Sequence, residues 1–119
     1  MTYVFRNNTI ERFLRGEYQY SGYNDFSIIP DADAYLWWYQ LPIKHNISQL
    51  ADEVMLFADK LQYIANQIGG KPFYIITIVN TGVPNIIMRD IRLSQAIAHF
   101  NNTAYSLAQE RNNIKVIDF

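Results

Sequence analysis

Two amphipathic helical patterns that alternate with short apolar runs constrain the fold of this sequence more than any other feature. In the first pattern, apolar residues recur at steps of four and three, at Leu50, Val54, Phe57, Leu61, Ile64 and Ile68. The second pattern repeats these steps at Leu93, Ile97, Phe100, Ala104 and Leu107. Such spacing places each set on one face of a helix. We expect one helix from Ser48, its predicted N-cap, to Gly69-Gly70, and another from Asp90, also a predicted N-cap, to Asn112-Asn113.

Four short segments rich in β-branched and aromatic residues are expected to be strands: 2–6, 34–40, 73–79 and 114–119. The two middle segments are apolar on both faces, which is typical of strands covered on both sides. A short helix is expected at 10–14 and an irregular segment at 17–29, whose aromatic side chains either reach the core or form a partner surface. Strands that alternate with helices predict an α/β fold with a parallel sheet.

The composition fits one globular domain spanning residues 1–119. Half of the 119 residues are apolar and 18% are charged, which excludes a disordered chain. The 10 basic and 11 acidic side chains give a net charge of −1, which argues against nucleic acid or an anionic membrane as the main partner. The absence of cysteine excludes disulfides and thiolate chemistry and fits a reducing compartment. Because no apolar run reaches about 18 residues and no signal peptide is visible, we expect a cytoplasmic protein.

The predicted sheet selects a set of candidate binding residues. In open parallel sheets, ligands bind beyond the carboxyl ends of the strands. The polar residues at these positions are Arg6, Asn7, Thr9, Gln40 and Asn80. We expect them to line one crevice that binds a substrate, with the alternative that they are polar because turns are solvated. No catalytic residue is assigned.

Patterns for catalysis or metal binding are weak. The sequence has neither a glycine-rich phosphate loop nor a Gly-x-Ser-x-Gly nucleophile elbow. His45 and His99 lack metal-ligand spacing, so we expect no metal and no cofactor. Asp31-Ala32-Asp33 is similar to the aspartate pair of haloacid dehalogenase phosphatases, but Pro30 separates it from the preceding apolar residues. We interpret this tripeptide as a turn before the strand at 34–40.

Several strings resemble the amino-terminal domain of FkbH-like proteins of haloacid dehalogenase subfamily IIIC. They are RNNTIE at 6–11, SGYND at 21–25, and a helix with Phe100-Asn101 that leads into KVID at 115–118. The resemblance covers essentially the whole chain and implies an SGNH-hydrolase-like, flavodoxin-like, three-layer α/β/α domain. In that family a haloacid-dehalogenase-type domain follows, and the best-known members load a glyceryl unit from a phosphorylated glycolytic intermediate onto an acyl carrier protein for polyketide assembly. Related proteins act in other biosynthetic clusters, including those for polysaccharides.

The sequence departs from SGNH hydrolases at each catalytic position. The loop Arg6-Asn7-Asn8-Thr9 lacks the serine nucleophile, and Gln40-Leu41-Pro42 stands where an asparagine oxyanion donor is expected. The family's Asp and His lie beyond the last strand, where this sequence stops. The resemblance therefore implies a non-catalytic domain that contacts substrate, an acyl carrier protein or the haloacid-dehalogenase-type domain.

Two alternatives stay open. One is a degenerate esterase or acyltransferase that uses Thr9 or Ser21 as nucleophile. The other is an assembly module that packs on a partner through residues 18–26 and the last predicted strand. That strand has no closing helix, so we expect either a longer natural protein that continues beyond Phe119 or a partner, such as a second copy, that covers it.

Overall fold

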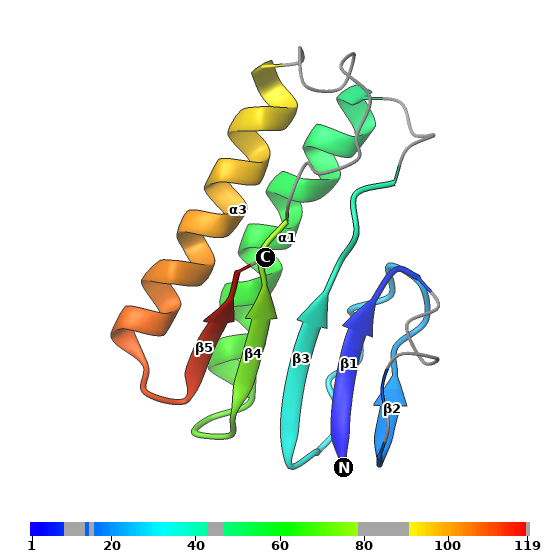
Figure 1. Cartoon of the computed structure of the whole chain (residues 1–119), viewed down its shortest axis with the longest axis vertical. Helices are drawn as coiled ribbons and strands as arrows, with labels where there is room; N and C mark the ends of the chain where they lie inside the picture. Colours follow the sequence, from blue (N-terminus) through cyan, green and yellow to red (C-terminus); the bar gives the residue numbers. More distant parts are fainter. Residues whose placement is uncertain (9–13, 15, 43–46, 79–90, 119) are drawn as a thin grey trace.

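The chain forms a five-stranded parallel sheet with two long helices in its described part (Figure 1). A computed structural model describes residues 1–8, 14, 16–42, 47–78 and 91–118. The strands are β1 (Thr2–Arg6), β2 (Tyr18–Tyr20), β3 (Ala34–Trp38), β4 (Phe73–Ile76) and β5 (Ile114–Ile117), and the helices are α1 (Ile47–Gln67) and α3 (Ile91–Glu110). The strand order is β2-β1-β3-β4-β5, and every adjacent pair is parallel. The predicted parallel α/β fold is confirmed, and the arrangement is compatible with three layers.

Both helices bury the apolar residues that the sequence predicts. Every member of the two stripes is buried: Leu50, Val54, Phe57, Leu61 and Ile64 on α1, Ile68 directly after it, and Leu93, Ile97, Phe100, Ala104 and Leu107 on α3. The two helices pack against each other, and α1 runs behind the sheet in Figure 1. Gly69, with φ of 64°, ends α1 in the left-handed conformation that glycine adopts readily. The prediction of Ser48 as N-cap is wrong, because α1 already begins at Ile47.

The strands differ from the predicted ones in length and number. β3 ends at Trp38 rather than at residue 40, β4 ends at Ile76 rather than at residue 79, and β5 ends at Ile117. β2 lies in the segment that we expected to be irregular, so that expectation is wrong for its three residues. β3 is central, as expected, but its two faces differ: Tyr35 and Trp37 are buried, whereas the intervening positions are half-buried. The helix expected at 10–14 and the cap expected at Asp90 fall largely or wholly outside the described residues.

Aromatic rings fill the core between the sheet and the helices. Trp37 is fully buried on β3, and its ring centroid lies 4.5 Å from that of Phe26, 5.4 Å from that of Phe57 and 5.8 Å from that of Phe100. Phe26 comes from the connection between β2 and β3 and is 4% exposed. Burial of a side chain of this size contributes about 2–3 kcal/mol. This connection is therefore anchored in the core by its phenylalanine.

Candidate functional site

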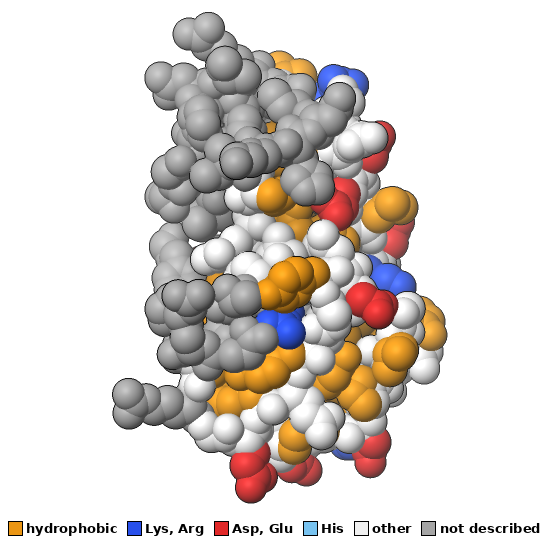
Figure 2. Space-filling view, turned by 90° about the vertical axis from the view of Figure 1, so that its right-hand side faces the viewer, with side chains coloured by type: hydrophobic (Ala, Val, Ile, Leu, Met, Phe, Trp, Pro, Cys, Tyr) orange, Lys and Arg blue, Asp and Glu red, His pale blue; other side chains and the backbone are white. Residues whose placement is uncertain are grey.

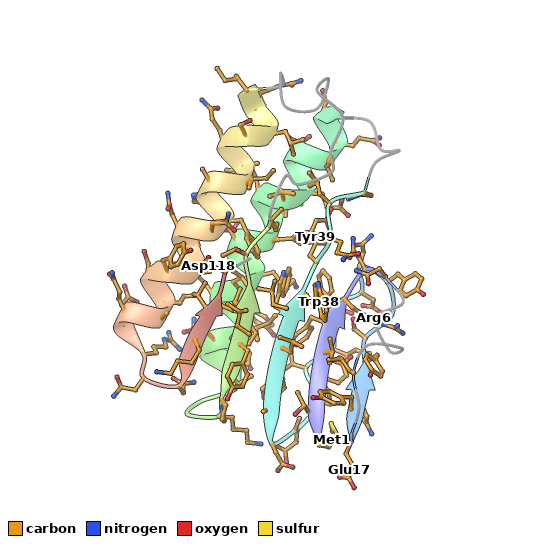
Figure 3. The ribbon with its side chains drawn as sticks, viewed as in Figure 1. Met1, Arg6, Glu17, Trp38, Tyr39 and Asp118 are labelled. Atoms are coloured by element: carbon orange, nitrogen blue, oxygen red, sulfur yellow. The ribbon has the colours of Figure 1, made fainter. Side chains whose placement is uncertain are left out.

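The carboxyl ends of β1 and β3 lie side by side at the point where the strand order changes direction. The strand that follows β1 in the sequence, β2, pairs on one side of β1. The later strands β3, β4 and β5 are added in turn on the other side. The last paired residues of β1 and β3 are Arg6 and Trp38. Figure 3 shows both at the same edge, far from Met1 and Glu17. In doubly wound sheets this reversal marks the usual place for a ligand, so we refer to it as the carboxyl-edge site.

Asn7 joins the two strands through its side-chain amide. Its Nδ2 donates a hydrogen bond to the Gln40 carbonyl oxygen at 2.6 Å, and its Oδ1 accepts one from the Gln40 N–H at 2.9 Å. Asn8 Nδ2 also donates to Asn7 Oδ1, at 2.9 Å. The amide thus continues the pairing of β1 and β3 beyond their last backbone partners. Sequence reasoning assigned Asn7 and Gln40 to ligand binding, and the structure brings them together through contacts that shape the site.

Arg6 places a positive charge at the carboxyl-edge site. Its guanidinium carbon lies 4.9 Å from the ring centroids of both Tyr20 and Tyr23, which is within the range of cation–π attraction. Its Nε donates to the Ser21 carbonyl oxygen at 3.0 Å, and Nη1 donates to the Asn8 carbonyl oxygen at 3.3 Å. In Figure 2, which looks onto the β2 side of the molecule, basic and hydrophobic surface lie next to each other. These contacts hold the cation in a defined place.

The SGYND segment, residues 21–25, folds over the end of β1. Asn24 has φ of 57°, and its N–H donates to the Arg6 carbonyl oxygen at 3.1 Å. Asparagine tolerates this left-handed conformation better than most residues. Ser27 donates to Asp25 through both its hydroxyl and its N–H, and these bonds lower the pKa of the Asp25 carboxyl. Of the aromatic residues in and beside this segment, Tyr23 is 54% exposed whereas Phe26 is buried, so the segment combines a core anchor with a surface ring.

Ser21 is buried at the centre of this segment. It is 3% exposed, its hydroxyl accepts a hydrogen bond from the Arg6 N–H at 3.1 Å, and it donates one to the Gly22 carbonyl oxygen at 2.9 Å. Both contacts are to backbone groups rather than to an imidazole. His99, the histidine within the described residues, lies on the exposed surface of α3. The Ser21 hydroxyl therefore has a structural role in fixing the SGYND segment to β1.

Two further side chains connect the carboxyl ends of the strands to the helices. The Tyr39 hydroxyl, just after β3, donates to Glu53 Oε2 on α1 at 3.3 Å. Burial raises the pKa of Tyr39 strongly, and the adjacent Glu53 charge and hydrogen bond raise it further. The Tyr105 hydroxyl on α3 donates to the carboxylate of Asp118, which directly follows β5. This hydrogen bond raises the pKa of Tyr105. The positions of Tyr39 and Asp118 are visible in Figure 3.

Asn101 of α3 repeats beyond β4 the contact that Asn7 makes beyond β1. Its Nδ2 donates to the Ile78 carbonyl oxygen at 3.1 Å, and its Oδ1 accepts from the Ile78 N–H at 3.0 Å. Ile78 is buried, so these bonds satisfy backbone groups that water does not reach. Sequence reasoning missed this role and those of Tyr20 and Tyr23. An available signal was the alternation Tyr18-Gln19-Tyr20 between glycines, which is compatible with a short strand.

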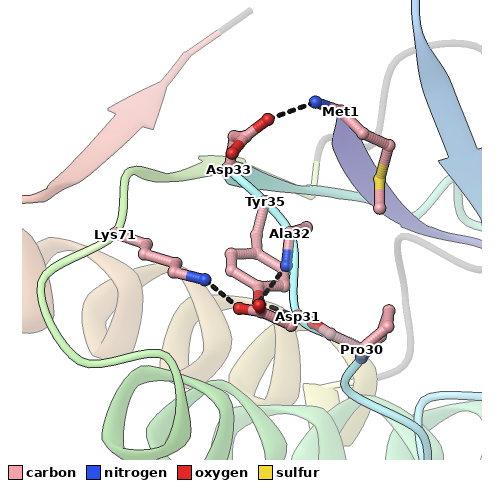
Figure 4. A network of polar contacts seen from close by, with 7 residues as sticks. All are labelled: Met1, Pro30, Asp31, Ala32, Asp33, Tyr35 and Lys71. Atoms are coloured by element: carbon pink, nitrogen blue, oxygen red, sulfur yellow. Dashed lines mark hydrogen bonds and ion pairs between the residues drawn. The ribbon is translucent and has the colours of Figure 1, made fainter.

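The opposite edge of the sheet holds the aspartates that precede β3 (Figure 4). Asp31 pairs with Lys71, whose pKa is raised by this hydrogen bond, and Asp33 pairs with the terminal ammonium of Met1. The Tyr35 hydroxyl donates to the Pro30 carbonyl oxygen at 2.6 Å and accepts from the Ala32 N–H at 3.1 Å. A phosphatase aspartate pair follows the carboxyl end of a strand, whereas this pair lies before β3. The interpretation as a turn therefore agrees with its position.

Not every predicted site residue can be placed. Arg6, Asn7 and Gln40 come together at the carboxyl-edge site, whereas Thr9, Asn80 and His45 lie outside the described residues. Among the residues that the structure describes, no three of His, Asp and Glu are grouped so that they could hold a metal ion. Neither α1 nor α3 is long and apolar enough to cross a membrane.

Comparisons with protein-family models, with curated proteins and with solved structures found no match.

Proposed function

We propose that this chain is a non-catalytic binding domain that acts as the amino-terminal SGNH-like domain does in FkbH-like biosynthetic proteins. In this role its carboxyl-edge site binds the phosphorylated three-carbon substrate or the acyl carrier protein, while a haloacid-dehalogenase-type domain performs the chemistry. The observation that supports the proposal most is the strand order β2-β1-β3-β4-β5, whose reversal at β1 brings Arg6 and Asn7 beside Gln40.

The charge of Arg6 supports an anionic ligand. A guanidinium binds phosphate and carboxylate oxygens well, because it is planar, always charged and weakly hydrated. The rings of Tyr20 and Tyr23 both lie within cation–π range of the guanidinium and help to fix its position. A ligand with a phosphate group would gain Coulomb attraction here without requiring the site to reorganise.

The surroundings of Ser21 support a role without catalysis. A serine nucleophile requires a base within hydrogen-bond reach and access to the substrate. Ser21 is buried, and its hydroxyl contacts the backbone groups of Arg6 and Gly22. The described part of the carboxyl-edge site thus contains a positive charge, side-chain amides and aromatic rings, which are groups suited to binding a ligand rather than to nucleophilic catalysis.

The proposal is tested by following amide NMR signals during titration with phosphoglycerate and, separately, with a phosphopantetheinylated acyl carrier protein. We expect one of them to shift signals of residues 6–8, 20–24 and 38–40. Arg6→Met should weaken that binding about tenfold or more, since it removes the site's cation. Lys115→Met, which removes an exposed positive charge on β5, is the matched control and should leave binding unchanged. No shift with either probe, or equal weakening by both substitutions, would refute the proposal.

A second measurement separates binding from hydrolysis. We expect the protein not to accelerate the cleavage of p-nitrophenyl acetate. If it does, and if Thr9→Ala or Ser21→Ala abolishes the activity while circular dichroism shows an intact fold, the chain is an esterase and the non-catalytic assignment is wrong.

A further inference from the structure

The helix layer has an apolar groove on the surface that faces away from the sheet. We call it the helix groove, and it is lined by Asp52, Met55, Leu56 and Asp59 of α1 and by His99 of α3. Its volume is about 360 Å³. Met55 is 45% exposed and Leu56 is 66% exposed, whereas the other face of α1 is buried against the sheet. Figure 2 shows hydrophobic side chains among acidic and basic ones at the right-hand side of that view, where the helix layer lies.

Two carboxylates, those of Asp52 and Asp59, flank the apolar residues of the helix groove. Within the described part of the chain, neither Asp52 nor Asp59 makes a hydrogen bond or an ion pair. They are seven residues apart, so they are separated by two helical turns, or about 10 Å along the axis. Met55 and Leu56 are three or four residues from each of them and therefore lie between them on the same side of α1.

Two acidic side chains, Asp52 and Asp59, line the helix groove together with His99. The third acidic residue of α1, Glu53, accepts a hydrogen bond from Tyr39 and does not line the groove. Basic side chains lie one turn beyond the groove at each end. The Lys60 ammonium, four residues after Leu56, lies 5.3 Å from the centroid of the Tyr63 ring, and Arg92 of α3 donates to the hydroxyl of Ser48, four residues before Asp52, at 2.7 Å. Exposed apolar side chains between two carboxylates disfavour nucleic acid and anionic membranes as occupants of the groove, and they favour a partner that is both apolar and basic.

We propose that the helix groove docks an amphipathic helix of a partner protein in which two basic residues, two turns apart, flank adjacent apolar side chains. Such a helix places its apolar residues against Met55 and Leu56 and one cation beside each aspartate. Docking of an amphipathic helix in a groove between helices is a common mode of recognition, and complementary charge fixes its register. This inference is independent of the proposed function, because the helix groove and the carboxyl-edge site share no residue.

The test uses a synthetic helical peptide of about sixteen residues that carries adjacent leucines with a lysine three positions away on either side. Fluorescence anisotropy should show saturable binding that weakens as salt is added. Leu56→Ser should weaken binding about tenfold, because it removes an apolar contact. Ile28→Ser is the matched control, since Ile28 is 64% exposed and lies outside the helix groove, and it should leave affinity unchanged.

Charge substitutions test the other half of the proposal. The double substitution of Asp52→Asn and Asp59→Asn should reduce affinity about fivefold and flatten the salt dependence. The control pair, Glu17→Gln and Glu110→Gln, removes the same charge elsewhere and should have no effect. All of these side chains are on the surface, so thermal denaturation should show unchanged stability.

Three results would overturn the proposal. The first is equal binding of a peptide with glutamates in place of the lysines. The second is equal weakening by the control substitutions. The third is sedimentation that shows a dimer which Leu56→Ser dissociates, because the helix groove would then be an interface between two copies of this chain.

Discussion

Replacing Asn101 by aspartate tests whether its amide holds the sheet to the helix layer. The substitution keeps an oxygen that accepts from the Ile78 N–H, but it replaces the donor that now lies 3.1 Å from the Ile78 carbonyl oxygen. An unsatisfied buried acceptor costs about 1–3 kcal/mol, and a carboxylate facing a carbonyl adds repulsion. We therefore expect Asn101→Asp to lower the free energy of unfolding by about 2–3 kcal/mol at neutral pH. For a domain of this size the melting temperature should fall by about 8–12 °C.

The loss should depend on pH in a predictable direction. A protonated carboxyl can donate to the Ile78 carbonyl oxygen, so the folded state favours the neutral form and raises the pKa of the new carboxyl above its unfolded value of about 4. The stability of Asn101→Asp, relative to the original protein, should then be highest below about pH 4 and should decrease as the pH rises through the folded pKa. Asn101→Ala should lose about 2–4 kcal/mol without this pH dependence.

Urea denaturation followed by circular dichroism at about pH 4 and pH 7 measures these differences. Asn102→Ala is the matched control, because Asn102 is the next residue on α3 and is exposed, and it should change stability by less than about 0.5 kcal/mol. The reasoning fails if Asn101→Ala is as mild as Asn102→Ala, or if the deficit of Asn101→Asp is the same at both pH values.

Three further substitutions test other parts of the structure. Tyr39 has a pKa raised by burial, so the protein should lose about 1.4 kcal/mol per pH unit above pH 10, and Tyr39→Phe should make this alkaline loss less steep in denaturation curves. Phe26→Ala should cost about 3–5 kcal/mol and reduce the near-ultraviolet circular dichroism, whereas Ile28→Ala should be nearly neutral; equal effects would place the β2–β3 connection outside the core. Gly69→Ala should cost about 1 kcal/mol in thermal unfolding because φ is 64°, and Gly70→Ala should not; similar melting temperatures would contradict the left-handed helix end.

The sequence predicts the helices and four of the strands well, because long apolar periodicities are dominated by burial. It fails at β2, which has three residues and a tyrosine-rich sequence that also suits a loop. β2 is a strand because β1 offers it an edge to pair with, and that is a tertiary effect. The predicted carboxyl ends of β3 and β4 lie two or three residues beyond the observed ones, because the apolar sequence continues there. In these extra residues, the side-chain amides of Asn7 and Asn101 take the place of a neighbouring strand's backbone as hydrogen-bond partners.

The position of the carboxyl-edge site could be predicted from topology alone, but the roles of its residues could not. Parallel strands bring Arg6, Asn7 and Gln40 to one edge regardless of their side-chain contacts. Whether an asparagine faces a ligand or a neighbouring backbone depends on distances that a linear pattern does not contain. Asn7 and Asn101 both form hydrogen bonds with a backbone peptide group. Only Asn101 shows a sign of this in the sequence, because it is a polar residue directly after Phe100 of the apolar stripe.

The chain's two tryptophans are neighbours in sequence and differ in surroundings. Trp37 is fully enclosed by aromatic rings, whereas Trp38 is half-buried beside Arg6 at the end of β3. If the carboxyl-edge site binds the proposed anionic ligand, their fluorescence reports on two separate events: emission from Trp37 follows loss of the folded state, and emission from Trp38 changes when a ligand occupies the site near the Arg6 guanidinium. Two variants that each keep one tryptophan would allow unfolding and ligand binding to be followed by intrinsic fluorescence, without an attached dye.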